Sequence, residues 1–243
     1  TEDARLSAVE AAWGPEDYAR AEEDLAALRA RQEREDSPEA LASLPVLTLA
    51  DLGEAKPRAP YHAETTANSD TLLVHEVPAG GIGYFAVHFP LPDLTVEELP
   101  YLAILARLLG RLATETHTAL ELDTASLLHL GGYSFQALIR SSDTDASFVE
   151  PRFVATASAL VPESAFAAEF LTELVCTTSF ADLPRIRTIL IQWKQGLEDA
   201  FVNSANLAAR ARVAASWRAS AACADRLSGG EFYRFLCNLL DNW

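Results

Sequence analysis

Apolar residues from position 99 to 112 recur at spacings of three and four, which predicts a helix with one buried face. The stripe consists of Leu99, Leu102, Leu105 or Ala106, Leu109 and Leu112. A second helical pattern, with Leu120, Leu127 and Leu130, is expected to stop at Gly131-Gly132, because glycine readily takes the left-handed conformation that ends helices. Residues 133–139 then alternate between apolar and polar, as in a half-buried strand. The region therefore predicts a packed helix pair followed by a strand.

Three further strands are predicted, over residues 71–77, 84–89 and 153–159. The first two flank a glycine-rich turn at 78–83, which permits a hairpin or a bulge. Neighbouring strands are joined by segments too short for crossover helices, so the sheet should be at least partly antiparallel. From Glu163 onward the pattern is helical, and the expected apolar stripes are 166–174, 186–197, 207–221 and, after Gly229-Gly230, 232–239. The fold class is α+β, with a mostly antiparallel sheet backed by several helices.

Residues 1–36 carry eleven carboxylates and five arginines around a thin apolar stripe. Pro15 follows Gly14 and precedes two acidic residues, which is typical of a helix start. The stripe, Tyr18, Ala21, Leu25 and Leu28, suits an arm lying against a partner helix or a solvated terminal helix. Ser37-Pro38 and Pro45 should end helices, and residues 53–70 have the composition of a connecting loop.

The formal net charge of -16, with 19 Lys and Arg against 35 Asp and Glu, argues against nucleic-acid binding. No apolar run approaches the length of a membrane span, so no membrane partner is expected. The cysteines, Cys176, Cys223 and Cys237, are interpreted as buried, reduced thiols of a cytoplasmic protein. The sequence begins with Thr1 and has no methionine, so we expect a piece of a longer chain.

The best candidate for a metal site is His117 with Glu121, four residues apart on a helix, and with Glu115 and His129 nearby. A helix-supporting surface pair explains these residues better than zinc does. His75 and His88 lie on separate predicted strands and could be neighbours, but a polar strand face explains them too. No nucleophile elbow or phosphate-binding loop occurs. Trp193, Trp217 and Trp243 are interpreted as core or interface aromatics. No catalytic, metal or cofactor-binding residue is therefore assigned.

Several stretches resemble the insulinase and pitrilysin class of zinc metallopeptidases, within the presequence protease subfamily. They are residues 32–52, 80–91 (GGIGYFAVHFPL), 99–135, 180–192 (FADLPRIRTILIQ) and 227–233 (LSGGEFY). The resemblance implies repeated α/β domains, of which the first carries an inverted His-x-x-Glu-His zinc motif on a helix. The counterpart of that helix here is 99–112, and its side chains Tyr101 to Leu105 can neither hold zinc nor act as a base.

The resemblance implies an internal fragment of an oligopeptide-degrading zinc metalloendopeptidase. Residues 1–45 would be the second arm of a helical hinge, and 46–243 a non-catalytic domain that forms part of a substrate chamber. Its partners would be the remaining domains of the parent chain and unfolded peptides. Zinc would belong to the parent's catalytic domain, and the fragment alone would be inactive. The alternative is a stand-alone, catalytically inactive domain that binds peptides or proteins.

Overall fold

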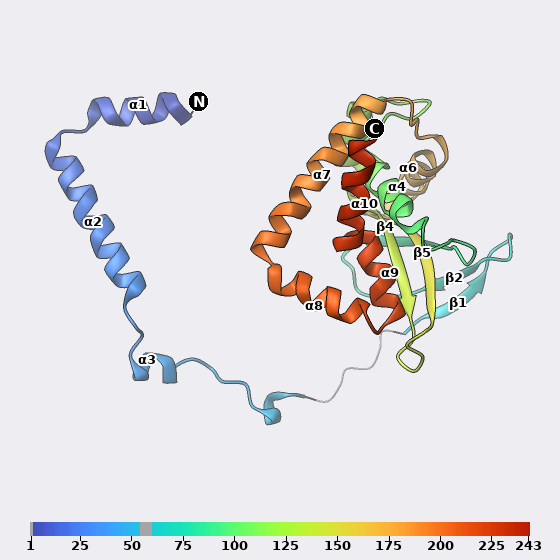
Figure 1. The fold of residues 1–243 in the computed structure, drawn as a ribbon, viewed down its shortest axis with the longest axis horizontal. Helices are drawn as coiled ribbons and strands as arrows, with labels where there is room; N and C mark the ends of the chain where they lie inside the picture. Colours follow the sequence, from blue (N-terminus) through green and yellow to red (C-terminus); the bar gives the residue numbers. More distant parts are fainter. Residues whose placement is uncertain (1, 54–59) are drawn as a thin grey trace. The chain divides into compact units, whose positions relative to one another are not determined.

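The computed structural model describes residues 2–53 and 60–243, and the chain divides into two compact units after His75 (Figure 1). We call residues 2–53 the arm and the second unit, Glu76–Trp243, the body. The role predicted for residues 1–45, as an arm of a helical hinge, and the role predicted for residues 46–243, as a non-catalytic domain, stay predictions. Residues 54–59, part of the predicted loop, lie outside the described residues.

Helices separated by extended segments make up the arm. They are α1 (Glu2–Ala12), α2 (Pro15–Glu33), α3 (Pro38–Ala42) and the 3-10 turn η1 (Leu49–Asp51). The predicted helix start at Pro15 is confirmed, and so are the helix ends predicted at Ser37-Pro38 and Pro45, since α2 ends at Glu33 and α3 at Ala42. The Asp17 carboxylate accepts a hydrogen bond from the Gly14 N–H at 2.8 Å, and the Ser37 hydroxyl caps α3 by accepting one from Ala40 N–H at 3.2 Å. No side chain described between Asp3 and Gly53 is buried, so the arm contributes no core.

A two-stranded antiparallel hairpin ends the first unit. Strands β1 (His62–Thr65) and β2 (Thr71–Val74) pair with His62 opposite Val74 and Thr65 opposite Thr71. The predicted loop over 53–70 was therefore wrong for 62–65. The hairpin that the glycine-rich turn would permit between 71–77 and 84–89 does not form, because β2 takes β1 as its partner across the tight turn at residues 66–70.

The body contains a three-stranded antiparallel sheet in the order β3-β5-β4, which confirms the α+β fold class. Its strands are β3 (Ile82–Pro90), β4 (Leu130–Ser141) and β5 (Val149–Leu160). Gly80 and Gly81, both with positive φ, lead the chain into β3. In the central strand Ala155, Ala157 and Ala159 are buried, as their alternation predicted. The sheet thus presents one face to the helices.

Helices cover that sheet and build the main core among themselves. They are α4 (Leu99–Leu108), α5 (Ala119–His129), α6 (Ser164–Thr177, after the 3-10 turn η2, Val161–Glu163), α7 (Leu183–Asn203), α8 (Ala205–Ala215), α9 (Ala219–Ser228) and α10 (Gly230–Asp241). Figure 1 shows α7 and α8 along one side of the body, with α9 and α10 between them and the sheet. Leu99, Leu190 and Phe232, from α4, α7 and α10, share one buried cluster.

The region 99–139 differs from its prediction in several ways. Helix α4 ends at Leu108 instead of Leu112, because Gly110 turns the chain with a φ of 78°. Leu120 and Leu127 of α5 are 74% and 78% exposed, while Leu122 packs on α6. The chief contacts of α5 are with β4 and those of α4 are with α9 and β4, so the two helices do not form the predicted pair.

The glycines that were expected to end a helix lie inside β4. Gly131 and Gly132 follow the helix end at His129 and accommodate a register shift against β5, without positive φ. The third helix predicted near the C-terminus is broken at Ser216, which leaves Val213 and Trp217 exposed. The helix does not continue because a turn at residues 216–217, between α8 and α9, folds the chain back on itself.

The cysteines do not share one environment. Cys223 is buried, and burial raises the pKa of its thiol. Cys237 is half-buried and Cys176 is exposed, so the prediction of three buried thiols was wrong for Cys176. All three are free in the part of the chain that the structure describes.

Candidate functional site

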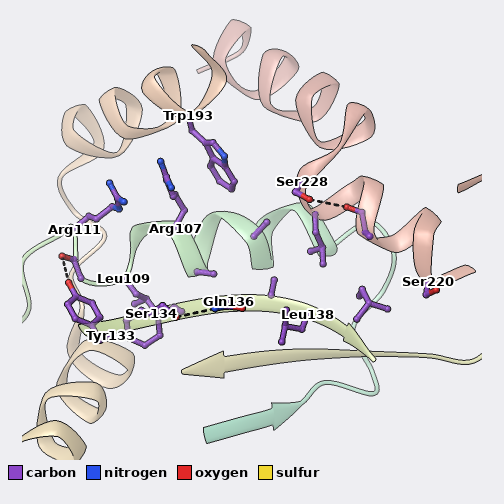
Figure 2. A pocket seen from close by; sticks show the side chains of 18 of the residues that line it. Arg107, Leu109, Arg111, Tyr133, Ser134, Gln136, Leu138, Trp193, Ser220 and Ser228 are labelled. Atoms are coloured by element: carbon purple, nitrogen blue, oxygen red, sulfur yellow. Dashed lines mark hydrogen bonds between the residues drawn. The ribbon is translucent and has the colours of Figure 1, made fainter. Parts of the chain in front are cut away.

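A large hollow of the body lies between α4 and β4 on one side and α7, α8 and α9 on the other (Figure 2). Its volume is about 1500 Å³. Four arginines line it, Arg107, Arg111, Arg185 and Arg218, and we call it the arginine cleft. Asp123 is the one acidic residue among its described lining residues. A cationic hollow in so acidic a chain is the arrangement most suited to binding a ligand.

Arg107 lies in the last turn of α4 and is half-buried in the cleft. Its guanidinium carbon lies 5.4 Å from the centre of the Trp193 ring, within the range of a cation–π contact. Its Nε is buried and has no hydrogen-bond partner among the described residues. Burial is the main cause that lowers the pKa of Arg107, and the nearby charge of Arg111 lowers it further. The side chain still stays charged, as arginines do in proteins. The site therefore holds a partly desolvated cation with an unused donor.

Arg111 is placed beside Arg107 by the turn at Gly110. A Cβ atom at Gly110 would clash with the ring and the hydroxyl oxygen of Tyr133, so the close approach of β4 needs glycine there. The Tyr133 hydroxyl donates to the Gly110 carbonyl at 3.3 Å. Burial is the main cause that raises the pKa of Tyr133, and the negative charge of Asp123 raises it further. The positive charge of Arg111 opposes this rise. Figure 2 shows Arg107 and Arg111 extending side by side toward α7, next to Trp193.

The floor of the cleft is the outer edge of β4. All residues from Tyr133 to Ile139 belong to the lining, although alternate side chains of a strand point to opposite faces. The cleft therefore runs along the strand's edge, and β4 is the last strand of the described sheet on that side. At one end Arg218 donates from Nη2 to the Ser142 carbonyl at 3.5 Å, near the exposed Trp217. The edge supplies backbone donors and acceptors to an extended ligand.

The histidine proposed as the best metal ligand takes part in a polar cluster instead. His117 Nδ1 lies 2.8 Å from Glu173 Oε1 on α6, and the Thr116 hydroxyl donates to the same oxygen at 2.6 Å. The hydrogen bond between His117 and Glu173 is the main cause that raises the pKa of His117, and the negative charge of Glu173 raises it further. A backbone hydrogen bond from the Glu115 N–H to the Thr177 carbonyl fastens the same loop to the end of α6. The cluster therefore joins a loop to a helix.

The other proposed ligands are spread over separate contacts. Glu121 caps α5 by accepting from Thr118 N–H and hydroxyl, both at 2.8 Å, and His129 pairs with Glu163 at 3.1 Å. His75 follows β2 and His88 lies in β3, and these strands do not pair. In residues 2–53 and 60–243, no three His, Cys, Asp or Glu side chains gather as a metal site would require.

The three tryptophans that the sequence suggested as core or interface residues differ from one another. Trp193 packs against the main core and its ring centre lies 4.4 Å from that of Phe232. Trp217 is 68% exposed and Trp243 is 47% exposed, so neither is a core residue, and Trp217 lines the arginine cleft. Sequence reasoning missed Arg107 and Arg111. Two arginines four residues apart at the end of an apolar helix, in an acidic chain, were the available signal.

Most of the chain, arm and body alike, is similar to known proteins. A profile for the family described as peptidase M16-C associated matches residues 1–239. Protein HypA of Clostridium perfringens is 27% identical over 212 residues, which cover 87% of this chain and 22% of that protein. The mitochondrial presequence protease of Yarrowia lipolytica is 26% identical over 208 residues, which cover 86% of this chain and 21% of that protein. Presequence protease 1 of Arabidopsis thaliana, described as chloroplastic and mitochondrial, is 25% identical over 240 residues, which cover 96% of this chain and 22% of that protein.

The chain spans about a fifth of the length of the curated relatives that it matches. Among the described residues, none of the helices combines the length and the apolar content that crossing a membrane requires.

Proposed function

The chain belongs to the peptidase M16-C associated family, and from this premise we propose that it is a non-catalytic part of a zinc-dependent, oligopeptide-degrading metalloendopeptidase. Its membership agrees with the resemblance to insulinase-type presequence proteases found in the sequence. In the proposal the body forms part of the wall of a substrate chamber, and the arm forms part of the hinge that joins the two halves of the parent.

The observation that carries the proposal is the family match across residues 1–239, from the start of the chain almost to its end. It covers the arm and the body together, so both belong to one recurrent unit of these peptidases. Since the chain spans about a fifth of its relatives, the peptidase activity is assigned to the parent protein.

The residues of α4 support the non-catalytic assignment. The resemblance implies that this helix carries the zinc ligands and the general base in the catalytic domain, whereas here Leu102, Ala103 and Ile104 are buried hydrocarbon side chains. The residues present do not fit zinc, and no catalytic step is derived through it. We place the metal and the glutamate base in another domain of the parent.

The exposed apolar residues of α2 support the hinge role. Tyr18, Leu25 and Leu28 are each about half exposed, and α2 has no buried residue. A half-exposed apolar stripe is typical of a surface that packs against another helix.

The cytoplasmic location expected from the sequence stays a prediction, since relatives from Yarrowia lipolytica and Saccharomyces cerevisiae are described as mitochondrial.

The test is reconstitution of activity from separate parts. The regions of the parent that flank this chain and the chain itself are purified separately and mixed, and cleavage of a fluorogenic oligopeptide is followed. We expect the mixture to cleave at least about tenfold faster than the same mixture without this chain. Zinc-dependent cleavage by this chain alone, or flanking regions that are equally active without it, would contradict the proposal.

A further inference from the structure

We propose that the arginine cleft binds the free C-terminal carboxylate of a peptide. The inference rests on the proposed function, because it assigns a substrate contact to the body of a peptide-degrading protein. It concerns binding by this chain alone, so it is tested separately from the activity of the parent.

The lining of the cleft is strongly cationic. Four of the chain's 19 basic residues line it, against one of its 35 acidic residues. Within the described residues, none of these four arginines lies within ion-pairing distance of a carboxylate. Some arginines elsewhere in the body do have such partners: Arg140 and Arg152 pair with Glu150, Arg212 with Asp225, and Arg234 with Glu231. The cleft is thus a place where four arginines without an ion pair lie together.

Arg107 is in an unfavourable electrostatic environment. One face of its guanidinium lies against Trp193, its Nε is buried without a partner among the described residues, and Arg111 adds a like charge nearby. Partial burial of a charge costs free energy, and so does repulsion between two neighbouring cations. A carboxylate bound between Arg107 and Arg111 would offset this repulsion. Arginine suits this role because its planar fork can hold both oxygens of a carboxylate.

The size of the cleft fits a peptide. At about 1500 Å³ the cleft is far larger than a single carboxylate needs, and it extends along the edge of β4 toward Trp217 and Arg218. It has room for several residues of an extended chain, with Leu138 and Trp217 as apolar contacts. A peptide matches these dimensions better than a small anion does.

The net charge of the chain selects among peptides. At -16, the molecule as a whole repels a peptide rich in Asp and Glu and attracts a neutral or basic one. Every such peptide still carries one negative group, its C-terminal α-carboxylate. A local cationic cleft on an acidic molecule is therefore matched to the end of the peptide and not to acidic side chains.

The experiment is a binding assay with two forms of one peptide. A neutral ten-residue peptide, labelled through its N-terminus with an uncharged fluorophore of the BODIPY class, is prepared with a free C-terminus and with a C-terminal amide. Fluorescence anisotropy is measured with the wild-type chain and with the variant Arg107→Gln/Arg111→Gln. We expect the wild type to bind the free acid about tenfold more tightly than the amide, and the variant to lose this preference.

The matched control is Arg29→Gln/Arg31→Gln, which removes the same charge from the exposed helix α2. It should keep the preference for the free acid to within about twofold. Because Arg107 is half-buried, folding of each variant is checked by circular dichroism. Should the double variant not fold, Arg111→Gln alone changes an exposed residue and should still reduce the preference at least about threefold.

Equal binding of acid and amide by the wild type would overturn the proposal, and so would a preference that survives the loss of both arginines. An amidated peptide with internal Glu residues that binds as tightly as the free acid would also overturn it, since the cleft would then select side-chain carboxylates. A failed reconstitution with intact acid preference would count against the proposed function and leave this inference standing.

Discussion

The arm and the body place similar apolar residues in opposite environments. Leu25 in α2 is 47% exposed, whereas Leu236 in α10 is fully buried among side chains of α4, α7 and α9. Both helices have apolar residues at helical spacing, but α2 has no buried residue, whereas α10 buries Phe232, Leu236 and Leu240. The arm's helices are therefore specified locally, by caps and proline positions, while the body's are held by tertiary packing.

The largest effect is expected from matched leucine truncations. Leu236→Ala should lower the free energy of unfolding by about 3–5 kcal/mol, because it opens a cavity in the main core. Leu25→Ala in the arm should change it by less than about 0.5 kcal/mol. Urea denaturation of both variants measures the contrast. A large loss from Leu25→Ala would mean that the arm shares the core of the body.

A buried charge gives the next largest effect. Asp225 is 5% exposed, accepts from Arg212 Nη1 at 2.6 Å, and accepts from the Gly230 N–H at the start of α10 at 2.8 Å. Asp225→Ala should cost about 2–3 kcal/mol, since a cap is lost while the half-exposed Arg212 stays hydrated. Asp24→Ala on the exposed arm is the control and should change little. Equal stability of the two variants would refute this account.

The turn that builds the arginine cleft is the third test. Gly110→Ala should destabilise the body by about 1–2 kcal/mol, because alanine disfavours the left-handed φ and its Cβ meets Tyr133. Gly196→Ala, in the middle of α7 with open space around it, should be neutral or slightly stabilising. Thermal unfolding distinguishes them. A neutral Gly110→Ala would show that the turn does not constrain Tyr133.

A smaller, pH-dependent effect is expected at His117. Its contact with Glu173 raises its pKa above 6.5, so the stabilisation is complete below that pH and is lost as the pH rises through the raised pKa. At the acid end, burial raises the pKa of Glu173, but hydrogen bonds from Thr114, Thr116 and His117 lower it below 4.5 overall. The stabilisation is therefore lost again as the pH falls through that lowered pKa.

Comparison of the unfolding temperatures of the wild type and His117→Gln across this range measures the effect. The difference should be largest between the two ordinary values, 4.5 and 6.5, and should shrink in alkaline solution. A difference that is constant with pH would contradict an ionic role for His117.

The sequence predicted local elements well where local chemistry decides them. The helix start at Pro15, the helix break at Ser37-Pro38, the alternation in β5 and the break at Gly229-Gly230 were all confirmed. It failed where distant segments compete. The strand 71–74 pairs with 62–65 instead of 82–90, and Leu120 and Leu127 face solvent although their spacing indicated burial.

The arginine cleft was not foreseen for the same reason. Arg107 and Arg111 lie near each other on the chain, but Arg185, Trp193 and Arg218 reach the cleft only through the packing of α7 and α9. The excess of acidic residues in the sequence also obscured a local cluster of the opposite sign. A count of charges along the chain cannot detect charges that gather only in the folded body.

The most direct test of the contrast between arm and body uses the reconstitution assay. Leu25→Asp/Leu28→Asp should raise the concentration of this chain needed for half-maximal peptide cleavage by about tenfold or more, with an unchanged unfolding temperature. The matched control Leu127→Asp/Val202→Asp changes body residues that are 78% and 80% exposed, and it should leave that concentration unchanged. Half-maximal cleavage at the wild-type concentration with the arm variant would contradict the claim that the arm is a contact surface of the parent peptidase.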